Sequence, residues 1–517
     1  MLETKNIKGR KQIYVEGSYS HTLTIPASWE FAKFSEVIEI IGGSQPPKSE
    51  FMSEPQGDCI RLIQIRDYKS DANIVYIPKA KAKRFVNKNE VMIGRYGPPI
   101  FQILRGLEGA YNVALMKANP LDGILLNDYL FRFLNNQNIY NYVESASDRT
   151  AGQSGVNKKH LEQYPVGIPP LKEQKRIVEK LDDVLAQVDA IKGRLDSIPA
   201  IIKRFRQSVL ASAVSGKLTE EWRDNFSIIE SVLDRYNAYK AETISSLSSS
   251  AQKNKLIKIH QETEHSEFIL KVPKSWEIKN LNKIAVGFNY GSSSKSQKQG
   301  SVPVLRMGNI QAGKLDWNDL VFTSDEIEID KYRLTDGDVL FNRTNSPELV
   351  GKTAIFRGEE DAIYAGYLIK VQGSKMLNAE FLNIVLNSRH AKNYCMSVKT
   401  DGVSQSNINA QKLGAFPCPL PPVEEQKEIV RLVDEYFALA DTIEAQVNKA
   451  RARVDKLTQS ILAKAFRGEL VPQDDNDEPA EKLLERIAQA KAEAEALAKA
   501  VKKAEAGKKR AAKTISK

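Results

Sequence analysis

Two stretches of this sequence are nearly the same: PPLKEQKRIVEKLDDVLAQVDAI begins at Pro169, and PPVEEQKEIVRLVDEYFALADTI begins at Pro421, 252 residues later. The match runs without a gap over residues 169–218 and 421–470, with 19 identities in 50 positions. Agreement over that length is far above chance. The chain therefore contains an internal repeat, and this repeat sets how the rest of the sequence is divided.

Both copies have the spacing of a long helix that pairs with another helix. Apolar residues recur alternately every four and three positions, the 3.5-residue period of a coiled-coil seam. Pro-Pro suits the start of each helix and glycine suits its end, whereas Pro199 is expected to kink or interrupt the first helix. Two such helices in one chain can pair antiparallel. We expect them to pair through Ile177, Leu181, Val188, Leu195, Ile202, Ile429, Val433, Ile443, Val447, Val454 and Leu457.

The segments before the two helices repeat more loosely. IPASWEF from Ile25 recurs as VPKSWEI from Val272, VMIGRYG from Val91 recurs as VLFNRTN from Val339, and QSGVN from Gln153 recurs as QSNIN from Gln405. Both segments contain short strand patterns bounded by Gly, Pro, Asn or Asp, such as CIRLIQI and GDVLFNRT, and one helix pattern each, NDYLFRFLNN and AEFLNIVLN. We therefore expect an α+β protein with two mixed, strand-rich domains that are separated by two long antiparallel coiled-coil helices.

The repeat predicts six parts: a first domain (1–168), a helix (169–220), a polar connector (221–270), a second domain (271–420), a second helix (421–470) and a charged tail (471–517). Within the connector, the Ser-rich stretch Ser245–Lys255 is expected to be flexible.

Composition excludes several classes of protein. No run of about 18 apolar residues could form a membrane span, and the N-terminal residues lack the apolar core of a secretory signal. Three distant cysteines, Cys59, Cys395 and Cys418, argue for a reducing cytosol and against structural zinc. The net charge is +10, but residues 480–517 hold eleven Lys or Arg and five Glu, a net of +6, which leaves +4 for the rest. The body of the chain is therefore only mildly basic.

No set of residues in the sequence predicts catalysis. Glu173-Gln174-Lys175 and Glu425-Gln426-Lys427 fit a fragment of metal-dependent nucleases, but both open a helix, so capping and partner contact are expected instead. Ser346 stands where a phosphate-binding loop requires glycine. Adenine methylases carry a tetrad in which Asn or Asp precedes Pro-Pro and an aromatic residue follows it. None of the four Pro-Pro pairs in this sequence has those neighbours. We expect no catalytic residue and no metal site.

A DNA interface is better supported. Arg95-Tyr96 and Arg343-Thr344-Asn345 each end a strand and enter a turn, where Arg and Asn can bind guanine and adenine edges. Cationic stretches at 79–84 and 291–300 suit phosphates. The residues expected to contact DNA are Lys81, Arg84, Arg95, Tyr96, Gln153, Lys295, Lys298, Arg306, Asn309, Arg343, Asn345, Lys352 and Gln405.

These features resemble the specificity subunits of type I restriction–modification enzymes (the HsdS family). The resemblance rests on Pro-Pro-x-x-Glu-Gln-Lys-x-Ile-Val at Pro169 and Pro421, the helix endings QSVLASAVSGKL and QSILAKAFRGELVPQ, and the PxSWE motifs at Pro26 and Pro273. It covers about residues 24–490. It implies two target-recognition domains, each reading one half of a bipartite, asymmetric DNA sequence, and helices that set the spacing between the halves.

The resemblance also implies partners. These are double-stranded DNA, two modification subunits that methylate adenine with S-adenosylmethionine, and two restriction subunits that translocate DNA with ATP. S-adenosylmethionine, ATP and Mg²⁺ are expected on those partners and no cofactor on this chain, which is expected to be cytoplasmic and to bind no membrane. Two alternatives stay open: the recognition subunit of a related system whose single partner is both methylase and nuclease, and a coiled-coil scaffold. Unequal globular segments on equal helices speak against a scaffold.

Overall fold

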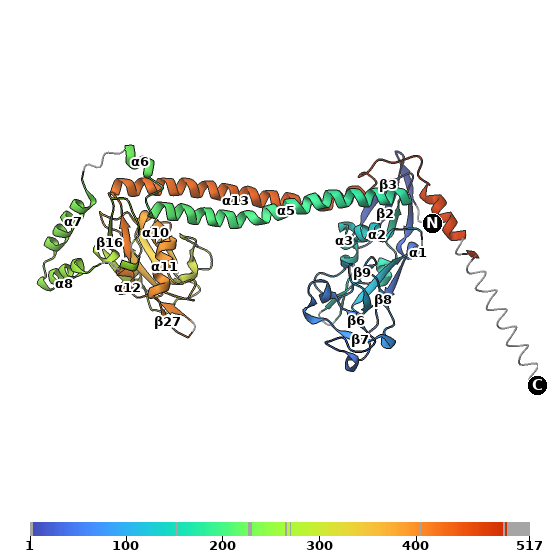
Figure 1. Cartoon of the computed structure of the whole chain (residues 1–517), viewed down its shortest axis with the longest axis horizontal. Helices are drawn as coiled ribbons and strands as arrows, with labels where there is room; N and C mark the ends of the chain where they lie inside the picture. The colour runs from blue at the N-terminus through green and yellow to red at the C-terminus, as the bar shows by residue number, and fades with distance from the viewer. Residues whose placement is uncertain are drawn as a thin grey trace, which may run out of the picture. The chain divides into compact units, whose positions relative to one another are not determined.

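Two long helices, α5 (Leu171–Val214) and α13 (Val423–Phe466), each contribute to both structural units of the chain (Figure 1). The computed structural model describes residues 4–121, 123–150, 153–225, 230–263, 266–268, 270–403, 405–489 and 492–493. Unit 1 consists of Met1–Leu195 and Lys449–Lys517, and unit 2 of Asp196–Asn448. Each unit therefore combines one strand-rich domain with the beginning of one long helix and the end of the other.

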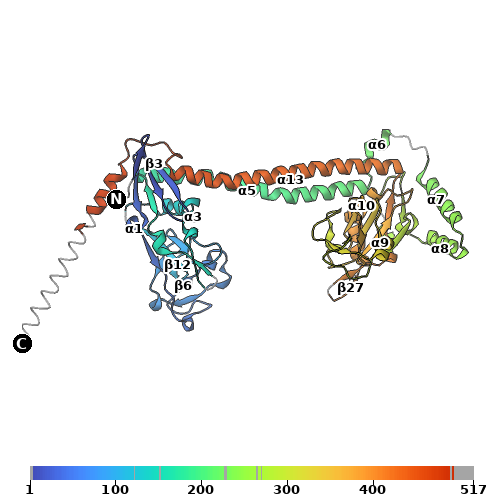
Figure 2. The same ribbon diagram turned by 180° about the vertical axis from the view of Figure 1, so that it is seen from behind.

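The two long helices pair antiparallel, as predicted. In unit 1 the first part of α5 packs against the last part of α13: Ile177 and Ile461 are buried in one cluster, and the Lys192 ammonium lies 3.1 Å from the Asp455 carboxylate. In unit 2 the last part of α5 packs against the first part of α13, where Arg206 donates to Glu444 at 3.0 Å. Both views of the chain show the two ribbons side by side (Figures 1 and 2).

Most of the predicted seam is buried, but not all of it. Ile177, Leu181, Val188, Ile202, Ile429, Val433 and Val447 are at most 8 % exposed, and Leu195 and Val454 are half-buried. The prediction is wrong for Ile443 and Leu457, which are 39 % and 46 % exposed. Val447 and Ile461, which follow these two residues by four positions in the same 3.5-residue series, are each 8 % exposed, so burial along α13 returns at the next position of the seam.

Pro199 does not interrupt α5, because the helix is continuous from Leu171 to Val214, so an interruption, one of the two outcomes expected of this proline, does not occur. A proline inside a helix removes one backbone hydrogen bond. Packing against α13 opposes this loss, because Val188 and Ile202 on either side of Pro199 are 3 % and 5 % exposed. Tertiary packing thus outweighs the local preference of the residue.

The strand-rich domain of unit 1 is built on two four-stranded sheets. One has the order β10-β9-β12-β5 and is antiparallel throughout; the other has the order β7-β6-β11-β8 and pairs β6 with β11 in parallel. The pair β4–β15 joins the start of the domain to its end. The strands are β1 (Lys5–Ile7), β2 (Arg10–Val15), β3 (His21–Pro26), β4 (Glu30–Lys33), β5 (Ile38–Gly42), β6 (Cys59–Ile63), β7 (Tyr76–Pro78), β8 (Phe85–Val86), β9 (Val91–Gly94), β10 (Gln102–Leu104), β11 (Gly109–Tyr111), β12 (Leu115–Pro120), β13 (Asp148–Thr150), β14 (Gln153–Gly155) and β15 (Pro165–Ile168).

The domain of unit 2 repeats the order of the first sheet and the parallel pair of the second. Its four-stranded sheet has the order β24-β22-β26-β17, and β16 joins β29. Its second sheet has three strands, in the order β21-β18-β25, with β18 parallel to β25. The strands are β16 (Glu277–Asn280), β17 (Gly287–Tyr290), β18 (Val302–Leu305), β19 (Ile310–Gln311), β20 (Lys314–Leu315), β21 (Val321–Thr323), β22 (Asp338–Asn342), β23 (Thr344–Asn345), β24 (Thr353–Ile355), β25 (Ile363–Tyr364), β26 (Leu368–Gln372), β27 (Thr400–Asp401), β28 (Ser406–Asn407) and β29 (Pro417–Leu420).

Three short helices repeat as well: α2 (Asn127–Leu134), α3 (Gln137–Ser145) and α4 (Lys158–Leu161) in unit 1, and α10 (Ala379–Asn387), α11 (Arg389–Val398) and α12 (Ala410–Gly414) in unit 2. The helix α1 (Phe34–Val37) lies between β4 and β5, and α9 (Glu326–Tyr332) lies between β21 and β22, so these two are not equivalent. The pairs α2–α3 and α10–α11 follow the central sheet in both domains. Two of them, α2 and α10, are the helices that the sequence pattern predicts.

The connector is ordered rather than flexible where the structure describes it. It forms α6 (Glu220–Asn225), α7 (Val232–Ser246) and α8 (Ser250–Gln261), so most of the stretch Ser245–Lys255 is helical. Val232 and Tyr236 are 3 % and 6 % exposed and belong to the core of unit 2. The Tyr236 hydroxyl also contacts His260 Nδ1 at 2.7 Å, which ties α8 to α7. A few buried contacts therefore hold a segment whose overall composition is polar.

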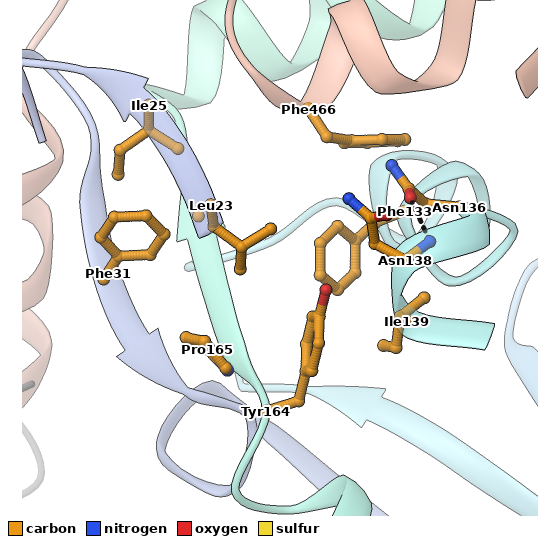
Figure 3. A pocket seen from close by; sticks show the side chains of 11 residues that line it. Leu23, Ile25, Phe31, Phe133, Asn136, Asn138, Ile139, Tyr164, Pro165 and Phe466 are labelled. Atoms are coloured by element: carbon orange, nitrogen blue, oxygen red, sulfur yellow. Dashed lines mark hydrogen bonds between the residues drawn. The ribbon is translucent and has the colours of Figure 1, made fainter. Parts of the chain in front are cut away.

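Part of the charged tail packs in the same way in unit 1. Residues 480–489 are helical, and Ala480 and Leu483 are 0 % and 2 % exposed. The Lys-rich remainder from residue 494 lies outside the described residues. Where the end of α13 meets the first domain, Phe466, Phe133 and Tyr164 line a cavity of about 20 Å³ (Figure 3). This space suits about one water molecule, so it is a packing gap and not a ligand site.

Candidate nucleic-acid interface

The repeated Glu-Gln pair at the start of each long helix anchors the strand-rich domain. In unit 1, Glu173 and Gln174 are 1 % and 0 % exposed. The Trp29 indole N–H donates to Glu173 Oε2 at 2.9 Å, and Gln174 accepts from the Leu126 N–H at 2.9 Å while donating to the Ile124 carbonyl at 2.9 Å. The expectation that these two residues face a partner is therefore wrong: they dock the PxSWE motif and the loop before α2.

Unit 2 contains the same arrangement. The Trp276 indole N–H donates to Glu425 Oε2 at 2.8 Å, and Gln426 accepts from the Asn378 N–H at 2.8 Å. Gln426 also donates to the carbonyls of Met376 and Pro421. Each domain is thus held on the first turn of its own helix by one indole–carboxylate hydrogen bond and by a glutamine side chain that both accepts hydrogen bonds from the backbone and donates them to it.

The end of the other helix completes each anchor. In unit 1, Gln473 donates to Glu173 Oε1 at 2.6 Å, and Arg176 binds Asp477 through both terminal nitrogens. Burial raises the pKa of the Glu173 carboxyl, and its hydrogen bonds from Trp29 and Gln473 oppose that rise. These contacts tie the segment after α13 to the start of α5.

In unit 2 the segment after α5 has the equivalent role at the start of α13. Thr219 donates to Glu425 Oε1 at 2.6 Å, and Arg235 of α7 binds Glu424 through both carboxylate oxygens.

A glycine ends each long helix against a proline of the PxSWE motif. Gly216 has φ +76° and Gly468 has φ +66°, in the left-handed region that favours glycine. A Cβ on Gly216 would lie 2.5 Å from the Pro273 ring, and one on Gly468 would lie 2.3 Å from the Pro26 ring. The motifs that repeat in the sequence are therefore in contact with each other in the structure.

The two predicted base-reading arginines occupy equivalent backbone positions. The Arg95 N–H donates to the Ala114 carbonyl, just before β12, and the Arg343 N–H donates to the Tyr367 carbonyl, just before β26. The Arg95 carbonyl accepts from the Val156 N–H at 3.0 Å, and the Arg343 carbonyl accepts from the Ile408 N–H at 2.9 Å. The equivalence that the loose repeat predicts is thus present in the fold.

The structure brings several predicted residues together around these arginines. In unit 2, β23 pairs with β28, which places Asn345 opposite Ser406 and next to the exposed Gln405. In unit 1, Tyr96 forms a bridge with Gly155 of β14, the strand that begins at Gln153. The side chain of Gln153 lies outside the described part of the chain.

The remaining predicted residues are dispersed. Arg84, Lys295 and Lys298 are exposed, and the Lys81 ammonium lies 3.4 Å from Glu50. Lys352 donates to Gln311 and Arg306 donates to the Asp319 carbonyl. Asn309 is 3 % exposed, and its amide donates to the carbonyls of Asp316 and Asn318, so it holds a loop together.

Sequence reasoning missed two groups. One is the indole–carboxylate pair, for which the signal was the recurrence of both the Trp and the Glu-Gln motif in each half of the sequence. The other is Tyr290, the last residue of β17, whose ring lies under the Arg343 guanidinium. Within the described ranges no group of His, Cys, Asp or Glu could hold a metal, and no helix there is long and apolar enough to cross a membrane.

Comparison with known families identifies this arrangement. Residues 26–200 and 273–450 each match the type I restriction modification DNA specificity domain. The chain belongs to this family. The two matched regions cover most of the two strand-rich domains and the larger part of the helix that follows each, so each half of the repeat carries one specificity domain.

Relatives of this specificity-domain chain extend over nearly its full length. It is 33 % identical over 494 residues to the type I restriction enzyme EcoKI specificity subunit of Escherichia coli K12, covering 90 % of this chain and 96 % of the relative. It is 30 % identical over 494 residues to the StySPI specificity subunit of Salmonella potsdam, with the same coverage. The chain thus belongs with type I specificity subunits, whose role is DNA sequence recognition.

Solved structures share the fold. A chain from a study of complex assembly and conformational transition of the type I R-M system superimposes with a TM-score of 0.61 at 17 % identity, covering 86 % of this chain and 99 % of the other. The HsdS subunit from Thermoanaerobacter tengcongensis gives a TM-score of 0.52 at 16 % identity, covering 86 % and 98 %.

Proposed function

We propose that this chain is the non-catalytic DNA-reading subunit of a type I restriction–modification complex, in which each strand-rich domain reads one half of a bipartite, asymmetric target. The observation that carries the proposal is the repeated topology with unequal loops. Both domains have the same strand order in one four-stranded sheet and the same anchor on a long helix, whereas the residues beside Arg95 and Arg343 differ. One scaffold with two different surfaces suits two different half-sites.

The anchors support a role for the helices in spacing. Trp29 and Trp276 bind buried carboxylates on the first turns of α5 and α13, which holds each reader against its own helix. A reader that could rotate on its helix would lose the register between half-sites. In this proposal the length of the paired helices sets the number of base pairs between the two halves.

The outer faces of the helices are proposed to dock two modification subunits. Large apolar side chains are exposed on these faces. In unit 1, Ile191 and Leu457 are 43 % and 46 % exposed, and in unit 2, Ile201 and Leu439 are 50 % and 51 % exposed. Apolar groups that face solvent on a rigid element are typical of a protein interface. The partners would supply the catalysis: adenine methylation with S-adenosylmethionine, and DNA translocation with ATP and Mg²⁺ by two restriction subunits.

Exchange of one domain tests the proposal. Residues 24–168 would be replaced by the corresponding segment of a related specificity subunit, and the methylated sequence would be mapped in cells that also express the modification subunit. We expect one half of the target to change and the other half and the spacing to persist. A simultaneous change of both halves would contradict the two-reader proposal. A matched exchange of residues 271–420 should alter only the opposite half.

A further inference from the structure

We infer that Arg343 and Arg95 each read a guanine, one in each half of the target, and that each is held for this task by a tyrosine ring. The inference rests on the proposed function, because it assigns a base and a positioning residue to each proposed reader. It predicts a guanine at equivalent places in both half-sites.

The Arg343 guanidinium lies over a ring in unit 2. Its central carbon is 4.7 Å from the centre of the Tyr290 ring, and among the described residues its side chain makes one long hydrogen bond, 3.3 Å from Nη1 to the Gly366 carbonyl. Its Nε is buried without a hydrogen-bond partner. The guanidinium is therefore oriented by stacking and by one weak hydrogen bond, and most of its donors are left unused.

Tyr290 is itself fixed in place. It ends β17, where it pairs with Ile369 of β26, and its hydroxyl accepts from the Ala410 N–H at 2.9 Å. The ring is nevertheless 42 % exposed, although tyrosines of the core such as Tyr364 are 1 % exposed. A tyrosine that is anchored at both ends but open to solvent forms a platform for the arginine above it.

Other arginines of the same domain do not share this state. Arg333 binds Asp361, and Arg357 binds Glu380 through two nitrogens, so both are neutralised within the domain. Within the described residues no carboxylate lies in ion-pair distance of Arg343. A half-buried cation that lacks an internal counter-charge is suited to an external acceptor.

Unit 1 builds the same pair from a different residue. The Arg95 guanidinium lies 5.0 Å from the centre of the ring of Tyr96, its neighbour in sequence. A Cβ on Gly155 would lie 3.2 Å from that ring, so glycine lets the ring lie directly on β14. The two arginines have equivalent backbone hydrogen bonds, but Tyr290 comes from β17, whereas Tyr96 lies just after β9. The shared feature is therefore the stacked arginine and not the local sequence.

Stacking suits a guanidinium for guanine recognition. A planar guanidinium can donate two parallel hydrogen bonds to guanine O6 and N7 in the major groove, which a lysine ammonium cannot match in geometry. A ring beneath it removes rotational freedom before binding. One good bidentate contact of this kind discriminates against another base by roughly ten-fold to a hundred-fold.

The test uses the complex with its modification subunit and duplexes that carry the mapped target. Each guanine is replaced in turn by 7-deazaguanine, which lacks the N7 acceptor, and equilibrium binding is measured. We expect one guanine in the half read by residues 271–420 at which the replacement weakens binding about ten-fold for the natural chain. In Arg343→Lys the same replacement should change binding less than two-fold. Arg95→Lys should give this result in the other half only.

Further variants separate positioning from folding. Tyr290→Leu should lower the 7-deazaguanine effect at the Arg343 guanine, whereas Tyr290→Phe, which keeps the ring, should retain most of it. Arg333→Lys is the matched control and should leave the effect unchanged. The inference is overturned if Arg343→Lys keeps the full effect at every guanine, or if a half-site contains no guanine. Such a result would leave the proposed function intact, provided that domain exchange still changes one half of the target.

Discussion

Replacement of Gln426 by leucine should selectively destabilise the second domain. Gln426 is fully buried, and its amide makes three hydrogen bonds: it accepts from the Asn378 N–H at 2.8 Å and donates to the carbonyls of Met376 at 2.8 Å and Pro421 at 3.0 Å. Leucine has a similar volume but no polar atom. Each backbone group that loses its only partner in a buried site costs about 1–3 kcal/mol. After allowance for the added apolar burial, we expect a loss of about 3–5 kcal/mol.

Hydrogen exchange reads this loss directly, because the Asn378 amide is itself one of the three partners. A loss of about 3–5 kcal/mol corresponds to exchange that is about two to three and a half orders of magnitude faster in the peptides that contain Asn378 and α10. Lys427→Leu is the matched control, since it introduces the same residue at the next, exposed position. If Gln426→Leu changed protection no more than Lys427→Leu does, the anchoring role given to the repeated Glu-Gln pair would be refuted.

Three other substitutions test separate parts of the account. Val447→Asp should lower the free energy of unfolding by several kcal/mol because it buries an unpaired charge, whereas Leu457→Asp at an exposed position should change the melting temperature little. Gly468→Ala should destabilise unit 1 by about 2 kcal/mol or more, because φ at Gly468 is positive and a proline ring occupies the Cβ position. Gly193→Ala should instead stabilise the protein by about 0.5–1 kcal/mol, because Gly193 lies inside α5 with open space around it. Thermal unfolding compares the two variants. Burial and two nearby lysines lower the pKa of His260 to about 4, so protonation of His260 favours the unfolded state. The stability of α7 and α8 that is present above pH 6.5 should therefore fall by about 1–2 kcal/mol as the pH drops towards 4. Hydrogen exchange of α7 and α8 should show this fall in the natural chain and not in His260→Gln.

The parts of the fold that sequence reasoning predicted are those with a strong period or an exact repeat. The helices α5 and α13, the strands β6, β9 and β22 and the helices α2 and α10 all lie where apolar spacing predicts them. The errors at Ile443 and Leu457 show that a 3.5-residue period identifies one face of a helix but does not fix how deeply each position on that face is buried. The continuity of α5 at Pro199 depends on packing against a helix more than 200 residues away.

The candidate site was predictable only in outline. The position of Arg95 and Arg343 at equivalent turns follows from the loose repeat, but the platform under Arg343 comes from β17, some 50 residues earlier in the chain. No local pattern connects Tyr290 with Arg343. Asn309 illustrates the opposite error. Its place in a loop predicts a base contact, but its amide donates to two carbonyls of the same loop, so its role is structural.

The buried Glu-Gln pair shows how a motif can be noticed and its role misassigned. A charged residue in the first turn of a helix usually faces solvent or caps the backbone. Glu173 and Glu425 are buried because an indole N–H from a motif about 145 residues upstream meets each carboxylate. Only the tertiary structure brings those two repeated motifs together.

A methylation map of genomic DNA, from cells with and without this gene in the presence of its modification subunit, tests the central claim most directly. The account predicts that adenine methylation at one split, asymmetric motif is present with the gene and lost without it, with a guanine in each half of the motif. An identical map in both cells, with the modification subunit shown to be expressed and active, would contradict the assignment of this chain as the DNA-reading subunit.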